Sequence, residues 1–493
     1  MNRLRRYAAI LLRARRRAGF WLGALEEAGA MISALRRRLG VDGAVAFTSL
    51  ARATSILGST GTVLLIVRLL TPVEQGYYYT LLSLVSLQLV FELGFSFVIQ
   101  QLAAHECVHL ELRADGSVSG DLQAHARLAS ALKLSMRWYS VAAAVMALIL
   151  APLGMFFFAR CGAHDDRVAW QGPWLVAVLA SSMSLWCLPF YSFLEGCGHV
   201  RAVAAMRLRQ STASALGAWV LLLMHHGLYA PVAMIVAQVA VGLLYLAGRR
   251  HLLAGLLRHR SGGIAIEWKR EVWPFQWRIA VSWMCSYFTV QALIPILFAL
   301  RGSVEAGQMG MSLSITGYMT GLVLPWISTK ATPFGRMIAN GQFRSLDQIF
   351  RRTFAQAMAV FGFIALGACA GAVLLPLISS RLAARMLPPH LFAALVIAAG
   401  ANCAVQCFAI LLRCFKREPF LLQSLLAASL TLLLAALTAP RWGDAGAALS
   451  YLAAAAGFAL PSAVNIFARV RHRYLAIHPA MGFAEERCAA FNR

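Results

Sequence analysis

The chain has 493 residues, 60% of them hydrophobic, and its mean hydropathy is +0.67. Soluble domains carry roughly 45–50% apolar residues, so this composition excludes a soluble globular protein. The formal net charge of +25 raises nucleic-acid binding as an alternative, and the placement of the charges decides between that function and membrane topology.

Residues 1–43 form a basic N-terminal segment, and residues 1–40 hold ten arginines. Apolar residues recur at three- and four-residue steps from Leu4 to Leu25, which predicts an amphipathic helix on an anionic membrane surface. An unstructured basic extension is the alternative.

Windows of about 20 residues with almost no charge recur along the rest of the chain and predict about twelve transmembrane helices. The windows are 45–70, 77–103, 138–159, 170–194, 209–226, 230–248, 274–300, 305–329, 354–379, 389–412, 419–439 and 444–467.

The basic residues follow these windows with a strong bias. With a cytoplasmic N-terminus, 36 of the 45 Lys and Arg fall on the cytoplasmic side, seven fall on the opposite side, and Arg52 and Arg278 lie inside windows. This positive-inside pattern predicts a multi-pass protein of the bacterial inner membrane with both termini cytoplasmic. It explains the charge without nucleic acid as a partner.

The two halves of the chain resemble each other. Val73, Glu74 and Gly76 open the second window, and the same three residue types open the eighth window 231 residues later. This echo favours an all-α fold with two repeat-related six-helix bundles. The expected organisation is a first bundle at 44–250, a cytoplasmic linker at 251–272, a second bundle at 273–470 and a cytoplasmic tail at 471–493.

Three stretches carry a resemblance to a known family: 69–78 followed by Phe91-Glu92-Leu93-Gly94, then 195–198, and then 325–336. They resemble Wzx-type polysaccharide flippases of the multidrug/oligosaccharidyl-lipid/polysaccharide (MOP) exporter superfamily. The resemblance implies that the two six-helix bundles surround a central cavity. The resemblance implies a flippase for O-antigen, lipopolysaccharide or exopolysaccharide synthesis. Its cargo would be an undecaprenyl-diphosphate-linked oligosaccharide, moved from the cytoplasmic to the periplasmic leaflet by alternating access.

Such a cargo needs positive charge and hydroxyl groups screened from acyl chains. Two windows carry both on one helix face, since their polar residues are spaced three or four apart. We therefore expect substrate contacts from Arg52, Ser55 and Ser59 in the first window and from Arg278, Ser282 and Ser286 in the seventh.

An arginine at mid-membrane depth costs a few kcal/mol unless it meets water, a counter-ion or an anionic ligand. Arg52 either lines the cavity and meets the diphosphate or an acidic sugar, or is neutralised by Glu92 at similar depth. Arg278 either lines the cavity or extends to lipid phosphates beside Trp273 and Trp277.

Lys330 and Arg336 follow the eighth window and either bind the head group at the cytoplasmic mouth or only maintain topology. Glu92 is the only acid well inside a window, so it is the candidate for proton or cation coupling. A hydrogen-bonded packing role is its alternative.

A membrane enzyme is disfavoured, because the chain has no HExxH or GxSxG stretch and its only adjacent aspartates are Asp165 and Asp166. We expect no catalytic residues, no metal site and no cofactor. A cation-coupled multidrug exporter of the same superfamily and a scaffold for other polysaccharide-assembly proteins remain as alternatives.

Overall fold

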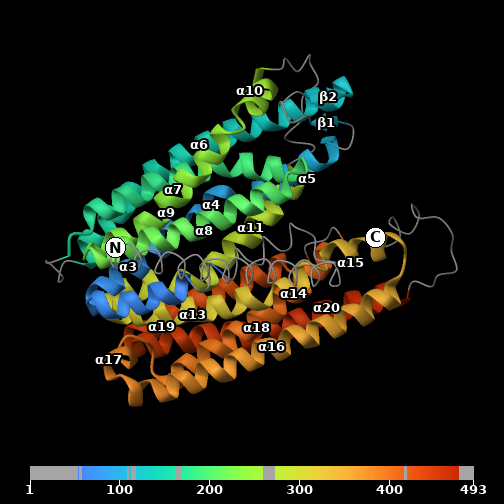
Figure 1. Cartoon of the computed structure of the whole chain (residues 1–493). Helices are drawn as coiled ribbons and strands as arrows, with labels where there is room; N and C mark the ends of the chain where they lie inside the picture. The colour runs from blue at the N-terminus through green and yellow to red at the C-terminus, as the bar shows by residue number, and fades with distance from the viewer. Residues whose placement is uncertain are drawn as a thin grey trace, which may run out of the picture.

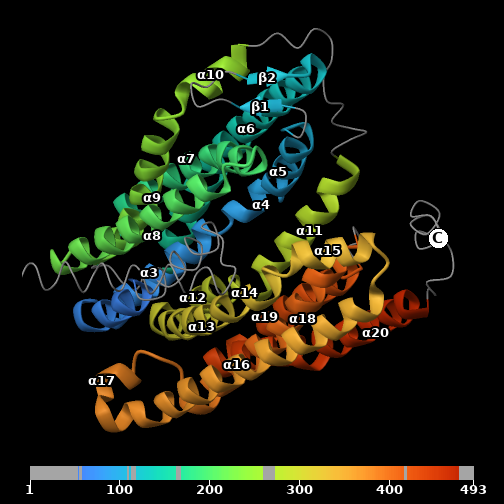
Figure 2. The same cartoon turned by 45° about the vertical axis from the view of Figure 1, so that its right-hand side comes forward.

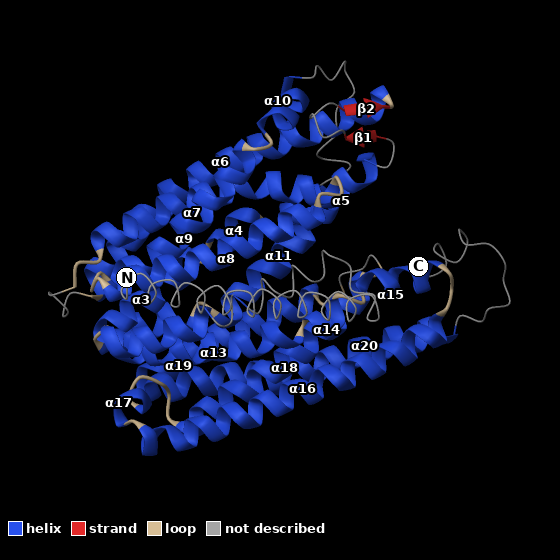
Figure 3. Cartoon of the chain, viewed as in Figure 1, coloured by secondary structure: helices blue, strands red, loops and turns tan. Residues whose placement is uncertain are grey.

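The computed structural model describes residues 54, 58–107, 110–112, 118–162, 168–258, 273–415 and 419–476. The predicted N-terminal helix, Arg52, Ser55 and most of the predicted linker and tail lie outside these residues. The described chain is helical apart from one hairpin, β1 (Leu110–Leu112) and β2 (Val118–Gly120), which pair antiparallel (Figure 3).

The first bundle begins with a short apolar helix at Gly58–Leu69 and ends with α9. Its further elements are α3 (Pro72–Val85), α4 (Gln88–Glu92), α5 (Phe95–Glu106), α6 (Leu122–Cys161), α7 (Gln171–Gly196), α8 (Val200–Leu223), the 3-10 turn η2 (Gly227–Tyr229) and α9 (Ala230–Ala247). The amphipathic helix α10 (Arg250–Arg258) follows it.

The second bundle mirrors this layout over the remaining chain (Figure 1). Its elements are α11 (Trp273–Val290), α12 (Leu293–Arg301), α13 (Ser303–Val323), α14 (Pro325–Ser328), α15 (Ala331–Ala339), α16 (Phe343–Ile378), α17 (Ser380–Ala383), α18 (Pro389–Arg413), α19 (Leu421–Leu452), the π-helix η4 (Ala453–Ala459) and α20 (Leu460–Ala476).

Local sequence explains where the second predicted span begins and bends. Thr71 caps α3 by accepting from the Glu74 backbone N–H, while the Glu74 carboxylate accepts from the Thr71 N–H, and Pro72 supplies a fixed first helical residue. Leu93 and Gly94 both have left-handed backbone angles, so the chain breaks between α4 and α5.

All twelve predicted windows contain helix, and the chain is an all-α polytopic membrane protein of two repeat-related bundles. Among the described residues, seven helical segments are long and apolar enough to cross a membrane by themselves. Other windows are interrupted, as by the break at Leu93. The eleventh and twelfth run together through Gly443, whose φ of 55° lies in the left-handed region.

Apolar side chains cover the outside of the bundles as well as their interior. On α16, Phe363 is 81% exposed and Leu377 is 84% exposed. A water-soluble surface would not carry such residues along one helix, whereas acyl chains accept them.

Candidate functional site

The two bundles touch closely at the end of the molecule that carries α17. Repeat-related helices α3 and α13 pack there, and the repeat-matched Gly76 and Gly307 face each other. A Cβ built on Gly307 would lie 2.9 Å from the Gly76 nitrogen, and a Cβ on Gly76 would overlap the Ser303 carbonyl. Glycine at both positions therefore lets the two backbones approach, as small residues do between transmembrane helices.

Hydrogen bonds across the bundles reinforce this contact. The Gln75 Nε2 atom donates to the carbonyls of Gly307 and Arg385, each at 3.0 Å. The Arg385 guanidinium donates in return to Gln75 Oε1 at 3.3 Å and to the Leu70 carbonyl. We call the Gln75, Gly307, Arg385 and Leu70 contacts the closed-end latch.

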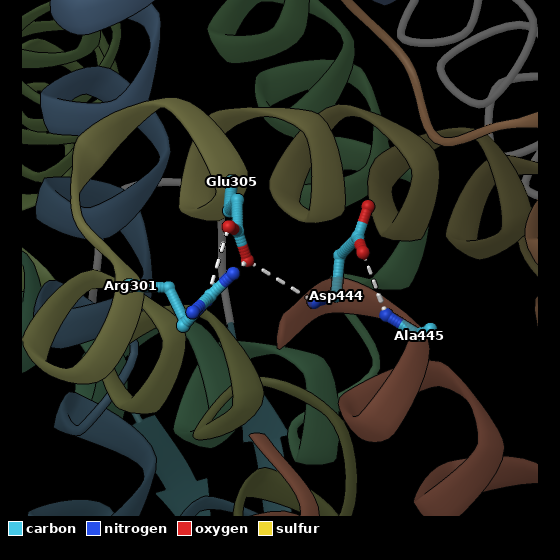
Figure 4. A network of polar contacts seen from close by, with 4 residues as sticks. All are labelled: Arg301, Glu305, Asp444 and Ala445. Carbon is cyan, nitrogen blue, oxygen red and sulfur yellow. Dashed lines mark hydrogen bonds and ion pairs between the residues drawn. The ribbon is translucent and has the colours of Figure 1, made fainter. Parts of the chain in front are cut away.

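Glu305, which matches Glu74 in the internal repeat, also stabilises a helix end. Glu305 pairs with Arg301 at 3.1 Å and accepts from the Asp444 backbone N–H at 3.2 Å, beside the turn at Gly443 (Figure 4). Glu74 caps its own helix instead. The two matched glutamates therefore stabilise the same end of the molecule through different partners.

At the opposite end, which carries α10 and α15, the ribbons of the two bundles diverge (Figure 2). Helix α11 of the second bundle runs between them and contacts α4 and α5. The arrangement is a pair of bundles joined at one end and spread at the other.

A cavity of about 470 Å³ lies between the bundles, inside the closed end. Helix α13 forms one wall with Thr316, Thr320 and two glycines, and Ser86 and Leu89 of the first bundle form part of the facing wall. The remaining polar lining comes from Tyr287, Gln291, Asn402, Gln406 and Tyr451. Hydroxyl and amide groups therefore dominate its polar surface.

A second cavity, of about 340 Å³, lies within the second bundle between α11, α18, α19 and η4. We call it the side pocket. It shares Leu89, Asn402 and Gln406 with the cavity between the bundles, so the two spaces adjoin. Ser282 lines it, and the Arg413 Nη2 atom lies 3.4 Å from the Ser282 hydroxyl.

Glu92 is buried, with 6% of its surface exposed, at the end of α4. The Ser96 hydroxyl donates to its Oε1 atom, and the buried Tyr139 and the exposed Arg207 are close enough to interact with it electrostatically. Arg207 also pairs with Glu195 at 3.0 Å. The carboxylate therefore lies in a polar cluster one helical turn from Leu89, which lines both cavities.

The structure separates the other predicted site residues. Ser59 lines a cavity of about 120 Å³ in the first bundle, closed by Ser314 and Tyr318 of α13. Arg278 is exposed and stacks over the Trp277 ring at 5.6 Å, outside the lining of the cavity between the bundles and of the side pocket.

Lys330 immediately precedes α15 and is exposed, and Arg336 lies within that helix. Neither residue lines the cavity between the bundles or the side pocket. The Ser286 side chain lies outside the described part of the structure.

Sequence reasoning missed Asn402, Gln406 and Arg413. The signal was present, because Asn402 and Gln406 are spaced four apart in an otherwise apolar window and Arg413 follows at its end. The predicted window stops at residue 412, whereas Arg413 is the last residue of α18 and lines the side pocket.

No family model and no curated protein matches the chain. Its backbone is similar to those of solved transporters at low sequence identity. The Vibrio cholerae MATE transporter VcmN, in its bent form, is 13% identical with a TM-score of 0.55, and the match covers 88% of this chain and 98% of that one. The MATE multidrug transporter DinF-BH, in complex with R6G, has 15% identity and a TM-score of 0.57 over 88% and 96%.

The lipid II flippase MurJ, in an inward closed conformation, has 11% identity and a TM-score of 0.55, covering 91% of this chain and 96% of that one. Identities this low establish the fold alone. The chain therefore has the fold of MOP-superfamily transporters, which MATE multidrug transporters share with a lipid II flippase.

Proposed function

We propose that the chain is a flippase that moves an undecaprenyl-diphosphate-linked oligosaccharide across the bacterial inner membrane by alternating access, for cell-surface polysaccharide synthesis. The observation that carries this proposal is the pair of adjoining cavities whose polar lining consists mainly of hydroxyl and amide groups. Within the described residues no carboxylate lines either cavity, and one guanidinium, Arg413, does. Such a lining suits a sugar-bearing anionic cargo.

The charge distribution orients the molecule in this proposal. Arg201, Arg207, Arg249 and Arg250 lie in or beside segments predicted to be cytoplasmic, at the spread end with α10. We therefore assign the spread end to the cytoplasm and the closed-end latch to the periplasm. The structure then corresponds to a state that admits cargo from the cytoplasmic leaflet.

Arg52 and Ser55 remain proposed cargo contacts, together with Ser59, Ser282, Ser286, Lys330 and Arg336. Arg278, exposed beside Trp277, is proposed instead to contact lipid phosphates. Glu92 remains the proposed coupling residue, supported by its burial and by the Ser96 hydrogen bond. In this role its carboxylate binds and releases a proton or cation as the bundles move.

The proposal is tested with the full chain in proteoliposomes supplied with lipid-linked oligosaccharide extracted from the cells that encode it. We expect transfer of the glycan between leaflets, Arg52→Ala to slow it at least ~10-fold, and Arg52→Lys to restore part of it, because Lys keeps the charge without the planar fork. Transport of an organic cation such as ethidium, without glycan transfer, would instead support the drug-exporter alternative.

The coupling role is measured in the same vesicles with an imposed proton or sodium gradient. Glu92→Gln keeps the volume and removes the titratable charge, so we expect transfer to lose its response to the gradient. The control is Glu106→Gln, a buried acid at the end of α5 that pairs with Arg127, and it should keep the response. An unchanged gradient response in Glu92→Gln would leave Glu92 with a packing role.

A further inference from the structure

The side pocket is built for a polar, ring-shaped ligand. Its volume of about 340 Å³ is at the small end of the range for small-molecule sites, roughly 300–1,000 Å³. Two aromatic side chains, Trp283 and Phe420, line it together with amides and hydroxyls from three helices. Aromatic faces beside amide groups match a pyranose, which has apolar C–H faces and a rim of hydroxyls.

One residue that lines the pocket, Gln423, has a buried polar atom that lacks a partner among the described residues. Gln423 is 5% exposed, and its Nε2 atom donates to the Ala459 carbonyl at 3.0 Å. Its Oε1 atom is buried and accepts no hydrogen bond from the described chain. Because an unsatisfied buried acceptor is costly, this atom calls for a donor from a ligand, and a sugar hydroxyl is such a donor.

The backbone of the second bundle is distorted at the same place. Residues 453–459 form the π-helix η4, a rare conformation that is frequent at functional sites. Ala455 and Ala459 of this stretch line the pocket, and the Ala459 carbonyl holds the Gln423 amide. The distortion thus positions Gln423, and the small alanine side chains leave space beside it.

Arg413 supplies the charge at the edge of the pocket. Its exposed guanidinium lies beside Ser282, where it can meet an anionic group attached to the ligand. Asn402 and Gln406 join the pocket to the cavity between the bundles. A cargo in that cavity can therefore extend one sugar into the pocket.

We propose that the side pocket is a monosaccharide subsite that recognises one pyranose residue of the transported glycan. This inference rests on the proposed function. Gln423 and Trp283 are its specificity-determining residues: Gln423 accepts from a sugar hydroxyl, and Trp283 packs against the ring. The second bundle thereby distinguishes lipids that carry glycan from lipids that do not.

The test measures binding of two probes to the full chain in lipid nanodiscs: bare undecaprenyl diphosphate, and the lipid-linked oligosaccharide extracted from the cells that encode the protein. The wild type is expected to bind the glycan-bearing lipid more tightly. Gln423→Leu, which keeps the side-chain size, is expected to reduce that preference about tenfold, the effect of one lost hydrogen bond of ordinary strength. Binding of the bare lipid should not change.

Trp283→Leu provides a second variant that does not disturb the Gln423 to Ala459 bond, and it should reduce the same preference. Gln210→Leu is the matched control. The Gln210 amide donates to the Gln238 carbonyl in the first bundle, and Gln210 lines neither the side pocket nor the cavity between the bundles. Retention of the wild-type preference in both pocket variants would overturn the subsite while leaving the flippase proposal intact. A wild type that binds neither lipid would overturn the proposed function itself.

Discussion

The two ends of the bundle interface are built differently. At the closed end, matched glycines bring α3 and α13 into backbone contact, and the latch adds hydrogen bonds from Gln75 and Arg385. At the spread end the ribbons diverge, and α11 bridges toward α4 and α5.

In the proposed transport cycle, the difference indicates which contacts must break when the molecule changes state. The closed end relies on close steric fit and on hydrogen bonds to backbone carbonyls, and both can be lost and reformed without unfolding a helix. Rocking of one bundle against the other would open this end and close the spread end. Changes confined to the closed end should therefore alter transport more than changes on outer surfaces.

The largest expected effect comes from Gly76→Ala. Its new methyl group meets the Ser303 backbone, which cannot move aside as a flexible side chain would. Overpacking of this kind costs about 1–3 kcal/mol, so the equilibrium for closed-end contact should weaken by about fivefold to about 150-fold, and glycan transfer should fall because the state open to the cytoplasm is less populated. Transfer is measured in proteoliposomes at equal protein content.

The matched control is Gly367→Ala on α16. A Cβ at Gly367 meets nothing within 4 Å, and the residue lines neither the cavity between the bundles nor the side pocket. This variant should keep most of the wild-type rate. Equal loss in both variants would argue against close packing at Gly76 as the cause.

A smaller effect is expected from Arg385→Ala, which removes two donors of the latch but leaves the glycine contact in place. Each lost hydrogen bond contributes about 0.5–1.5 kcal/mol, so reaction of a thiol probe with Gln308→Cys at the closed end should rise several-fold. Arg381→Ala, an exposed neighbour on α17, should leave labelling unchanged. Equal rates of thiol labelling in the two variants would contradict a stabilising role for the closed-end latch.

The smallest effect is expected from Arg278→Ala. Its guanidinium is exposed over Trp277, and exposed cation–π contacts contribute about 0.5–1 kcal/mol. Glycan transfer should change by less than about threefold. A loss as large as that of Gly76→Ala would place Arg278 on the cargo path, as the polar stripe of its helix first indicated.

The positions of the helices were predictable because uninterrupted apolar windows leave the chain little alternative to membrane-spanning helix. The echo of Glu74 and Gly76 at Glu305 and Gly307 predicted related bundles, but not that the two glycines face each other. The helix break at Leu93 was harder to predict from the sequence, because a left-handed backbone conformation is sterically unfavourable for leucine and depends on its surroundings.

The site was less predictable than the fold. Glu92 was identifiable as an acid within an apolar window, and it is buried. The side pocket was missed because Ser282, Gln406 and Gln423 belong to three helices that are distant in sequence. Only the packing of α11, α18 and α19 brings them together, and no spacing within one helix reveals it.

The central claim is that glycan transfer requires the closed end to open. In a chain with its native cysteines replaced, Gln75→Cys and Arg385→Cys can be joined by a cleavable two-headed thiol reagent that replaces the latch with a covalent link. The account predicts that transfer of lipid-linked oligosaccharide in proteoliposomes falls to the protein-free level when the link is present and returns when it is cleaved. Transfer at the unlinked rate with the closed end fully joined would contradict it.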